Sequence, residues 1–257
     1  MKAEIPAPYP NPTILEAICE FHFTSNDESL KNWDGKWYGR LHSKLGENYD
    51  MEPKTAKGII ISSTQGKTTL GENVISINQM LYTHKTNERL IQLAPWTLTI
   101  NEIGQYSSWQ SFLVHIEHAW KALFSIIGSL QIKRIGMRYI NLIPRTSEDP
   151  VGDWINKNDL LPKRILDQRK DFFLRCEIPH SENMRLIITL TEQQTDSAIK
   201  PIIFDIDTFI INDLDGGNWN EINNSLTLLH SVIRKEFDDS QTTKLNTYLN
   251  QKQKKRN

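Results

Sequence analysis

The stretch Arg134-Ile135-Gly136-Met137-Arg138-Tyr139-Ile140-Asn141 lies near the middle of the 257-residue chain and carries its clearest fold signal. Successive side chains of a β-strand point to opposite faces of the sheet, so apolar and basic side chains of this stretch would separate. One face takes Ile135, Met137 and Tyr139, and the other takes Arg134, Gly136 and Arg138. The stretch therefore predicts a central strand with an open face, whose two guanidinium groups require partners or a ligand.

Residues 14–23 alternate in the same way and predict the first strand. The side chains expected to face inward are Leu15, Ala17, Cys19, Phe21 and Phe23, with Glu16, Ile18, Glu20 and His22 on the other face. If this strand lies beside residues 134–141 at the sheet centre, carboxylates would oppose guanidinium groups across the two strands. We expect Arg138 to meet Glu16 or Glu20.

These residues define a predicted central polar cluster, which consists of Glu16, Glu20, His22, Arg134, Arg138 and Asn141. One interpretation is a set of structural ion pairs that fixes the strand register. The other is the polar floor of a groove that receives an anionic or peptide ligand.

Two long amphipathic helices are expected to cover the sheet. The first runs from Ser107 or Ser108 to Ile127, where Gly128 ends it, and the second follows Gly216 and Gly217. Shorter helices are expected over residues 30–45, 153–168 and 242–249, and further strands near 58–63, 74–83, 89–93, 96–101, 172–178, 184–191 and 202–211.

The order of these elements recurs in the second half of the chain. Residues 97–103 and 208–214 share a similar pattern, and each precedes a tryptophan and a long helix. The prediction is an α+β fold of two β-α-β-β-β-(β)-α repeats, residues 1–130 and 131–257, which share one curved antiparallel sheet with the long helices on one face. The two repeats are expected to form one compact unit with a pseudo-two-fold axis.

The composition narrows the class of protein. Charged residues make up 24% and hydrophobic residues 38% of the chain, which is typical of a globular protein. The net charge of −1 supplies no global basic field for nucleic acid, and the dense basic run at residues 252–256 fits a solvated chain end. Residues 1–6 lack the apolar core of a signal peptide, so a cytoplasmic protein without membrane contact is expected.

Two further sets of residues are weaker candidates for metal binding. Asp205 and Asp207 would share one face of a strand, where paired carboxylates can hold a divalent cation or sit in ion pairs. His115 and His118 would share one flank of the first long helix, without an evident third ligand. No complete catalytic set, cofactor motif or metal site emerges, so no cofactor is expected.

Several stretches resemble a sporadically distributed family of uncharacterised prokaryotic proteins. They are the proline-rich residues 7–12, the segment 14–21, Tyr106-x-x-Trp109-x-x-Phe112 and Arg134-x-Gly136-x-Arg138-Tyr139-x-Asn141. The resemblance covers essentially the whole chain, and the last motif is its most specific part. The family carries no assigned reaction, and its patchy occurrence implies mobile genes such as those of defence or toxin–antitoxin systems.

The sequence favours a non-enzymatic module that binds a protein or peptide partner. It is also compatible with a homo-oligomer. The alternatives are a metal-dependent nucleic-acid enzyme that uses Asp205 and Asp207, and a nucleic-acid-binding protein with a saddle-shaped surface.

Overall fold

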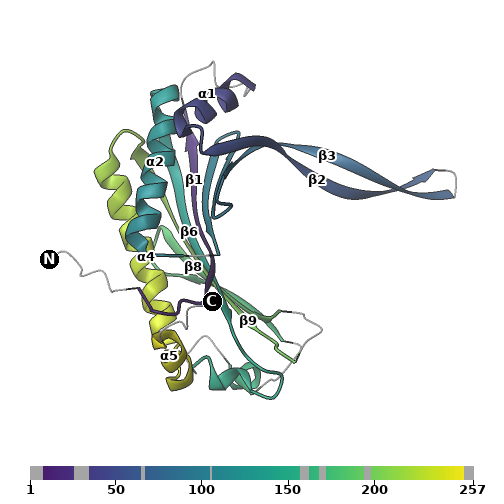
Figure 1. Cartoon of the computed structure of the whole chain (residues 1–257), viewed down its shortest axis with the longest axis vertical. Helices are drawn as coiled ribbons and strands as arrows, with labels where there is room; N and C mark the ends of the chain where they lie inside the picture. The colour runs from purple at the N-terminus through teal and green to yellow at the C-terminus, as the bar shows by residue number, and fades with distance from the viewer. Residues whose placement is uncertain are drawn as a thin grey trace.

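The computed structural model describes residues 8–25, 35–64, 67–104, 106–156, 162–167, 172–193 and 198–251, with the backbone alone for residues 55–78. Within these residues the chain has an α+β fold, as predicted, with one large antiparallel sheet and helices on one of its faces (Figure 1). The sheet curves away from the helices, so its open face is concave (Figure 1).

Nine strands of the described chain form the sheet, in the order β2-β3-β4-β5-β1-β6-β9-β8-β7. Their bounds are β1 Ile14–Thr24, β2 Tyr49–Thr64, β3 Lys67–His84, β4 Arg89–Ala94, β5 Thr97–Ile103, β6 Gln131–Ile143, β7 Phe173–Pro179, β8 Met184–Glu192 and β9 Ile202–Asp215. The helices are α1 Gly35–Leu45, α2 Trp109–Ile127, α3 Lys163–Leu166, α4 Trp219–Asp239 and α5 Thr243–Asn250, with a 3₁₀ turn, η2, at Val151–Asp153.

The pairing of β1 with β6 lies at the middle of this sheet. The two strands are antiparallel, with Cys19 opposite Met137 and Glu20 opposite Gly136. The prediction that these strands lie side by side is therefore confirmed. Because β1 also pairs with β5, and β6 with β9, this junction joins the strands of both halves of the chain into a single sheet.

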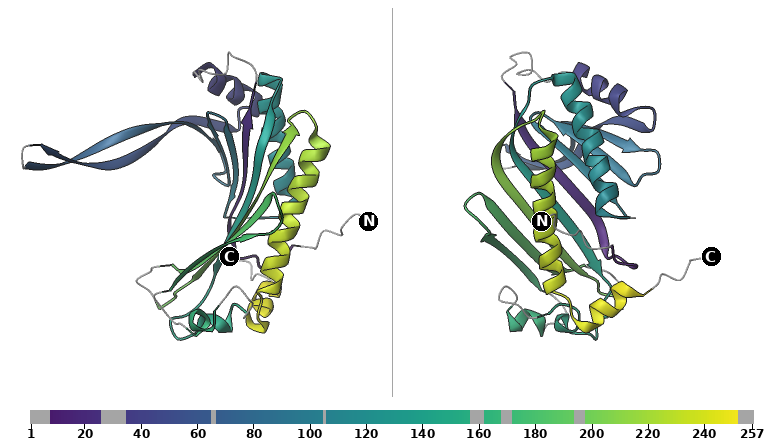
Figure 2. Two further views of the ribbon diagram at one scale, coloured as in Figure 1. Left: turned by 180° about the vertical axis from the view of Figure 1, so that it is seen from behind. Right: turned by 90° about the vertical axis from the view of Figure 1, so that its left-hand side faces the viewer.

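Helices α2 and α4 lie along the convex face and bury the apolar side of the central strands (Figure 2). The apolar face of β1 is fully buried at Ala17, Cys19 and Phe21, although Leu15, predicted to face inward, is 42% exposed. The register of β1 on β6 shifts between Ile14 and Glu16, so the strict alternation does not extend to Leu15.

The ends of α2 follow the predicted capping chemistry. The Ser108 side chain accepts a hydrogen bond from the backbone N–H of Ser111, which satisfies a donor in the first turn. Gly128 ends the helix in the left-handed conformation, with φ 81°, and its N–H bonds the carbonyl of Phe124.

The first hairpin departs most from the sequence-based prediction. Short strands near residues 58–63 and 74–83 were expected, whereas β2 and β3 pair continuously from Tyr49–His84 to Thr64–Lys67, apart from one bulge near Pro53. Figure 1 shows that this hairpin projects from the body on the concave side of the sheet. The two strands of this hairpin form backbone hydrogen bonds with each other along their whole length. The pairing therefore extends beyond the residues with an alternating apolar pattern, and the glycines within the strands do not end it.

The helix expected over residues 153–168, irregular and interrupted at Pro162, is confirmed in the described residues only as a short helix after Pro162. The structure has only the short η2 turn and the four-residue α3 there. The predicted helix over 30–45 is confirmed from Gly35 onward, with Trp37, Leu41 and Leu45 buried, and residues 26–34 lie outside the described chain.

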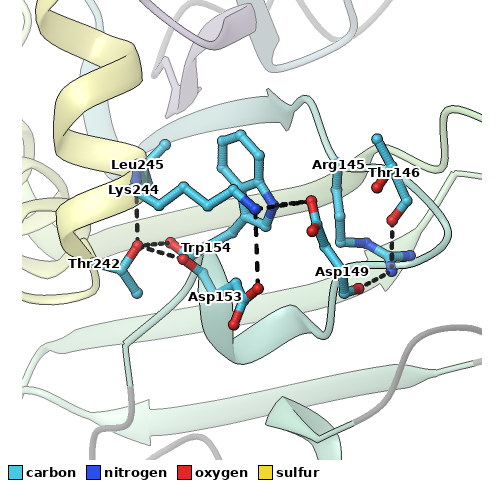
Figure 3. A network of polar contacts seen from close by, with 8 residues as sticks. All are labelled: Arg145, Thr146, Asp149, Asp153, Trp154, Thr242, Lys244 and Leu245. Atoms are coloured by element: carbon cyan, nitrogen blue, oxygen red, sulfur yellow. Dashed lines mark hydrogen bonds and ion pairs between the residues drawn. The ribbon is translucent and has the colours of Figure 1, made fainter.

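A network of polar contacts holds the loop after β6 against the start of α5 (Figure 3). Lys244 forms an ion pair of 2.9 Å with Asp149 and lies 4.8 Å from the centre of the Trp154 ring. The Thr242 hydroxyl donates to the backbone carbonyl of Asp153 and caps α5. In the same loop, Arg145 forms a fully buried ion pair with Glu192 and donates to the carbonyl of Asp149 at 2.8 Å, which satisfies a charge that would otherwise be costly to bury.

None of the described helices is long and apolar enough to cross a membrane.

Gly216 and Gly39 allow a paired test of how closely other atoms approach a glycine in this fold. An added Cβ on Gly216 would lie 2.7 Å from the carbonyl oxygen of Leu130 and 3.1 Å from the Trp120 ring, whereas Gly39 in α1 has open space around it. We expect Gly216→Ala to lower the free energy of unfolding by about 1–3 kcal/mol, because backbone and ring must move. Gly39→Ala is expected to raise it by up to about 1 kcal/mol, because alanine favours helix. Urea unfolding of both variants measures the difference, and equal effects would contradict the close approach at Gly216.

Candidate functional site

The open face of β1, β6 and β9 carries charged side chains from alternate positions of the three strands. They form a central ion-pair cluster, which consists of Glu20, His22, Arg134, Arg138, Asp205 and Asp207. The opposite faces of the same strands are apolar and lie under α2 and α4, so the alternation of the sequence places the charges on the concave side.

Arg134 and His22 both bind the carboxylate of Glu20. A guanidinium nitrogen of Arg134 lies 2.6 Å from Glu20 Oε1, and His22 Nε2 lies 2.6 Å from the same oxygen. These contacts, led by the His22 hydrogen bond, lower the pKa of Glu20 to about 2. The guanidinium carbon of Arg134 also lies 4.3 Å from the centre of the Phe209 ring, which adds a cation–π contact.

Gly136 explains part of the spacing of the Arg-x-Gly-x-Arg motif. A Cβ built on Gly136 would contact the guanidinium group of Arg134 at 3.4–3.6 Å. The Arg134 side chain therefore lies across the face of β6 over the glycine, where a methyl group would make ordinary van der Waals contact and a side chain larger than alanine would meet the guanidinium group.

The carboxylate partner of Arg138 is Asp205, not Glu16 or Glu20 as predicted. Arg138 donates from Nε at 2.8 Å and from a terminal nitrogen at 2.6 Å to the two oxygens of Asp205, a bidentate ion pair. The prediction was wrong because it considered only β1 as the neighbour of β6. The sheet order places β9 on the other side of β6, and the longer reach of arginine makes the diagonal position on β9 accessible.

Asp207 lies directly opposite Arg138 on β9 and is only partly exposed. Burial raises the pKa of its carboxyl group to about 6, against the opposing effects of Arg134 and Arg138 and with help from the negative charges of Asp205 and Glu20. Among the carboxyl groups of this cluster, Asp207 is therefore the one whose charged form is least favourable near neutral pH.

A chain of hydrogen-bonded side chains continues the polar surface from the cluster toward the projecting hairpin. Lys54 Nζ donates to Gln92 Oε1 at 3.0 Å, and Gln92 Nε2 donates to Asn101 Oδ1 at 3.0 Å. Asn101 Nδ2 in turn donates to Glu16 Oε1 at 2.6 Å, and Gln79 Nε2 reaches Gln92 Oε1 at 3.2 Å. This amide chain, which consists of Lys54, Gln79, Gln92, Asn101 and Glu16, connects five neighbouring strands.

The cluster and the amide chain border one open cavity of about 370 Å³ on the concave face. Its lining includes Glu20, Arg134, Arg138 and Asp207 from the cluster and Lys54, Gln79, Gln92 and Asn101 from the amide chain. The volume lies at the lower end of the range of sites that bind small molecules, and polar groups dominate its wall.

The sequence-based prediction missed the three amides of the cavity wall. Gln79, Gln92 and Asn101 are polar residues that each follow or precede an apolar residue on their strand, and Asn101 is almost completely buried. A buried amide on a strand is a detectable signal, since it must have hydrogen-bond partners. Its partners come from different strands, however, and these required the sheet order.

Asn141 does not join the predicted cluster. It lies on the helix side of β6, where its amide accepts from Thr13 Oγ1 at 3.0 Å and donates to the carbonyl of Phe204 at 3.2 Å. Residue 141 has the parity of Tyr139 rather than that of Arg138, so alternation along β6 already predicts this face.

Side chains from three separate segments of the chain meet on that helix side. Tyr106 and Tyr139 share a hydrogen bond of 3.0 Å between their hydroxyl groups, and both line a small cavity of about 60 Å³ with Trp109, Asn141 and the proline-rich segment at Pro8–Pro12. This is a mainly apolar surface closed by the chain itself, and its aromatic rings belong to the core.

The arrangement at Asp205 and Asp207 opposes a divalent metal ion. The guanidinium group of Arg138 already neutralises both oxygens of Asp205, and a second positive charge there would be repelled. Across the described part of the chain, no group of three or more histidine, cysteine, aspartate or glutamate side chains is placed to hold a metal ion.

Comparison with known proteins assigns the chain to no family. No protein-family model matches the chain, and no curated protein matches it.

Asp207 makes the stability of the protein depend on pH. Its pKa is raised on folding from its ordinary value near 4 to about 6, so folding favours the protonated carboxyl group. Stability from this group is present below pH 4 and is lost as the pH rises through 6. We expect Asp207→Asn to be more stable than the wild type at pH 7.5, by up to about 3 kcal/mol, and equally stable at pH 4.

Urea unfolding at both pH values measures this difference. Asp50→Asn makes the same chemical change at an exposed position of β2 and serves as the control. A loss of stability in Asp207→Asn at pH 7.5 would show instead that the charged carboxylate is a net favourable partner of the arginines.

Proposed function

We propose that this protein is a non-enzymatic binding module whose concave sheet face holds a protein or peptide partner. The observation that carries the proposal is the open polar cavity at the sheet centre, bordered by amides and paired charges beside the projecting β2–β3 hairpin. Helices cover the other face, so the concave face is the one available to a partner (Figure 2).

The chemistry of the cavity wall suits a peptide. Glutamine and asparagine side chains present both an N–H donor and a carbonyl acceptor, which match the alternating groups of an extended peptide backbone. The ion pairs of the central cluster add fixed positions of positive and negative charge that can select the side chains of the partner.

The same geometry disfavours nucleic acid and metal-dependent catalysis. Binding to a phosphate backbone relies on uncompensated lysine and arginine side chains. Here Arg134 and Arg138 are each bound to a carboxylate, and Lys54 donates to a glutamine. The arrangement supports balanced recognition of a polar partner better than attraction to a polyanion.

The proposal extends to the origin and setting of the module. We propose that residues 1–130 and 131–257 are two copies of one β-α-β-β-β-(β)-α unit, a duplication supported by the antiparallel contact of β1 with β6 and by a long helix after each set of strands. The resemblance to a sporadically distributed prokaryotic family supports a role in a defence or toxin–antitoxin system.

A pair of photo-crosslinking positions tests the binding face. Gln79 lines the concave cavity, whereas Leu228 is exposed on α4 at the opposite face. With a photo-reactive amino acid at position 79, we expect one reproducible crosslinked protein or peptide from the native cells. Position 228 is expected to give none of it. Capture of the same partner from position 228 alone would contradict the proposal.

Substitutions of the Arg138–Asp205 pair separate binding from folding. Arg138→Met leaves the buried Asp205 carboxylate without its partner, so we expect a loss of about 1–3 kcal/mol in unfolding free energy. The double substitution with Asp205→Leu removes both charges and should recover most of this loss. We expect the double variant to fold yet to lose the crosslink from position 79. A stable double variant with full crosslinking would assign the pair a purely structural role.

A further inference from the structure

We infer that a second cavity, between α2 and the first residues of β2 and β4, binds a small oxyanion, a phosphate monoester or a carboxylate, through Arg89, His115 and His118. The cavity has a volume of about 330 Å³ and is separate from the concave face, since it opens on the helix side of the sheet. Its remaining wall is formed by Tyr49, Ser111 and Val114.

His115 supplies a buried hydrogen-bonding group that the protein leaves unused. The side chain is 3% exposed, and its Nε2 lies 3.1 Å from the hydroxyl group of Tyr49. Its Nδ1 is buried and has no hydrogen-bond partner among the described residues. When the Tyr49 hydroxyl donates to Nε2, the neutral ring carries its proton on Nδ1, and that N–H requires an acceptor. A buried donor without an acceptor is costly, so the site would be stabilised if the His115 ring turned to present this N–H to an oxygen of a ligand in the cavity.

The other groups around the cavity are cationic or can become so. Arg89 from β4 and His118 from the next turn of α2 border it together with His115, and His84 lies nearby with its ring 5.1 Å from that of Tyr49. Burial, with the positive charges of Arg89, His118 and His84, lowers the pKa of His115 to about 3. An anion between Arg89 and His118 would oppose this repulsion and supply an acceptor at the same point.

Two carboxylates face this region and must be considered with the cations. Glu102 lies directly opposite Arg89 on β5, but burial raises the pKa of its carboxyl group and so favours its neutral form. Glu88 is exposed at the end of the loop before β4, where solvent screens its charge. Among the described residues neither carboxylate forms an ion pair with Arg89, and the guanidinium group borders the cavity, where a ligand can reach it.

The side chains and the volume of the cavity limit the class of ligand. Arginine, histidine and serine side chains offer donors that suit phosphate or carboxylate oxygens. The volume leaves room for a small organic group attached to the anion. The exposed Val114 at the rim gives that group an apolar contact.

Titration of the full-length protein with inorganic phosphate, and separately with acetate, tests the inference. The readout is the histidine ring resonances in NMR at fixed pH and ionic strength, with His118 assigned through His118→Gln. We expect saturable shifts at His115 and His118. A preference for phosphate would identify a phosphate monoester as the ligand class, and a preference for acetate a carboxylate.

Three variants make the result specific. Arg89→Met removes a charge-assisted hydrogen bond and is expected to weaken binding about tenfold or more. His118→Gln changes an exposed side chain and is expected to weaken binding severalfold. Arg175→Met removes an equal charge from the exposed face of β7 and should leave binding unchanged. The absence of saturable shifts with either anion, or equal weakening by Arg89→Met and Arg175→Met, would overturn the inference.

Discussion

The antiparallel contact between β1 and β6 is the constraint on which the rest of the structure depends. It joins strands that are more than a hundred residues apart in sequence, and every strand on either side is attached through one of these two. Backbone groups inside a sheet must pair, so neither strand could be left as an exposed edge under the covering helices. Closing this contact carries a high entropic cost, which the two apolar faces buried under α2 and α4 offset.

β6 shows how one strand can serve two environments at once. Its helix side contributes Tyr139 and Asn141 to a dense region where aromatic rings and buried amides are mutually satisfied. Its concave side holds Arg134 and Arg138, each bound to a carboxylate on a different neighbouring strand. The Arg-x-Gly-x-Arg-Tyr-x-Asn motif is therefore two sets of residues with different roles, interleaved by the two-residue period of the strand.

The concave face is polar without carrying a strong net field. Arg134 and Arg138 at its centre are neutralised within the sheet, and its amides bind one another in a chain across five strands. Such a surface remains partly hydrated and ordered in the absence of a ligand, and the pre-formed donors and acceptors reduce the entropy lost when a partner binds. Asp207 is the exception, since its carboxylate is partly buried and no cationic side chain of the described residues forms a hydrogen bond with it. Functional sites commonly retain groups of this kind.

The sequence by itself determined the class of the fold and the inner face of the central strands. Alternation in residues 134–141 and the helical spacing of residues 109–127 are local consequences of strand and helix geometry, so they could be predicted without knowing any neighbour. Only the tertiary structure decided which charges meet. Arg138 selects Asp205 because β9 lies beside β6, and Gln92 and Asn101 become part of a cavity because three other strands place their partners around them. These contacts join residues through the order of strands in the sheet, which side-chain periodicity along the chain does not encode.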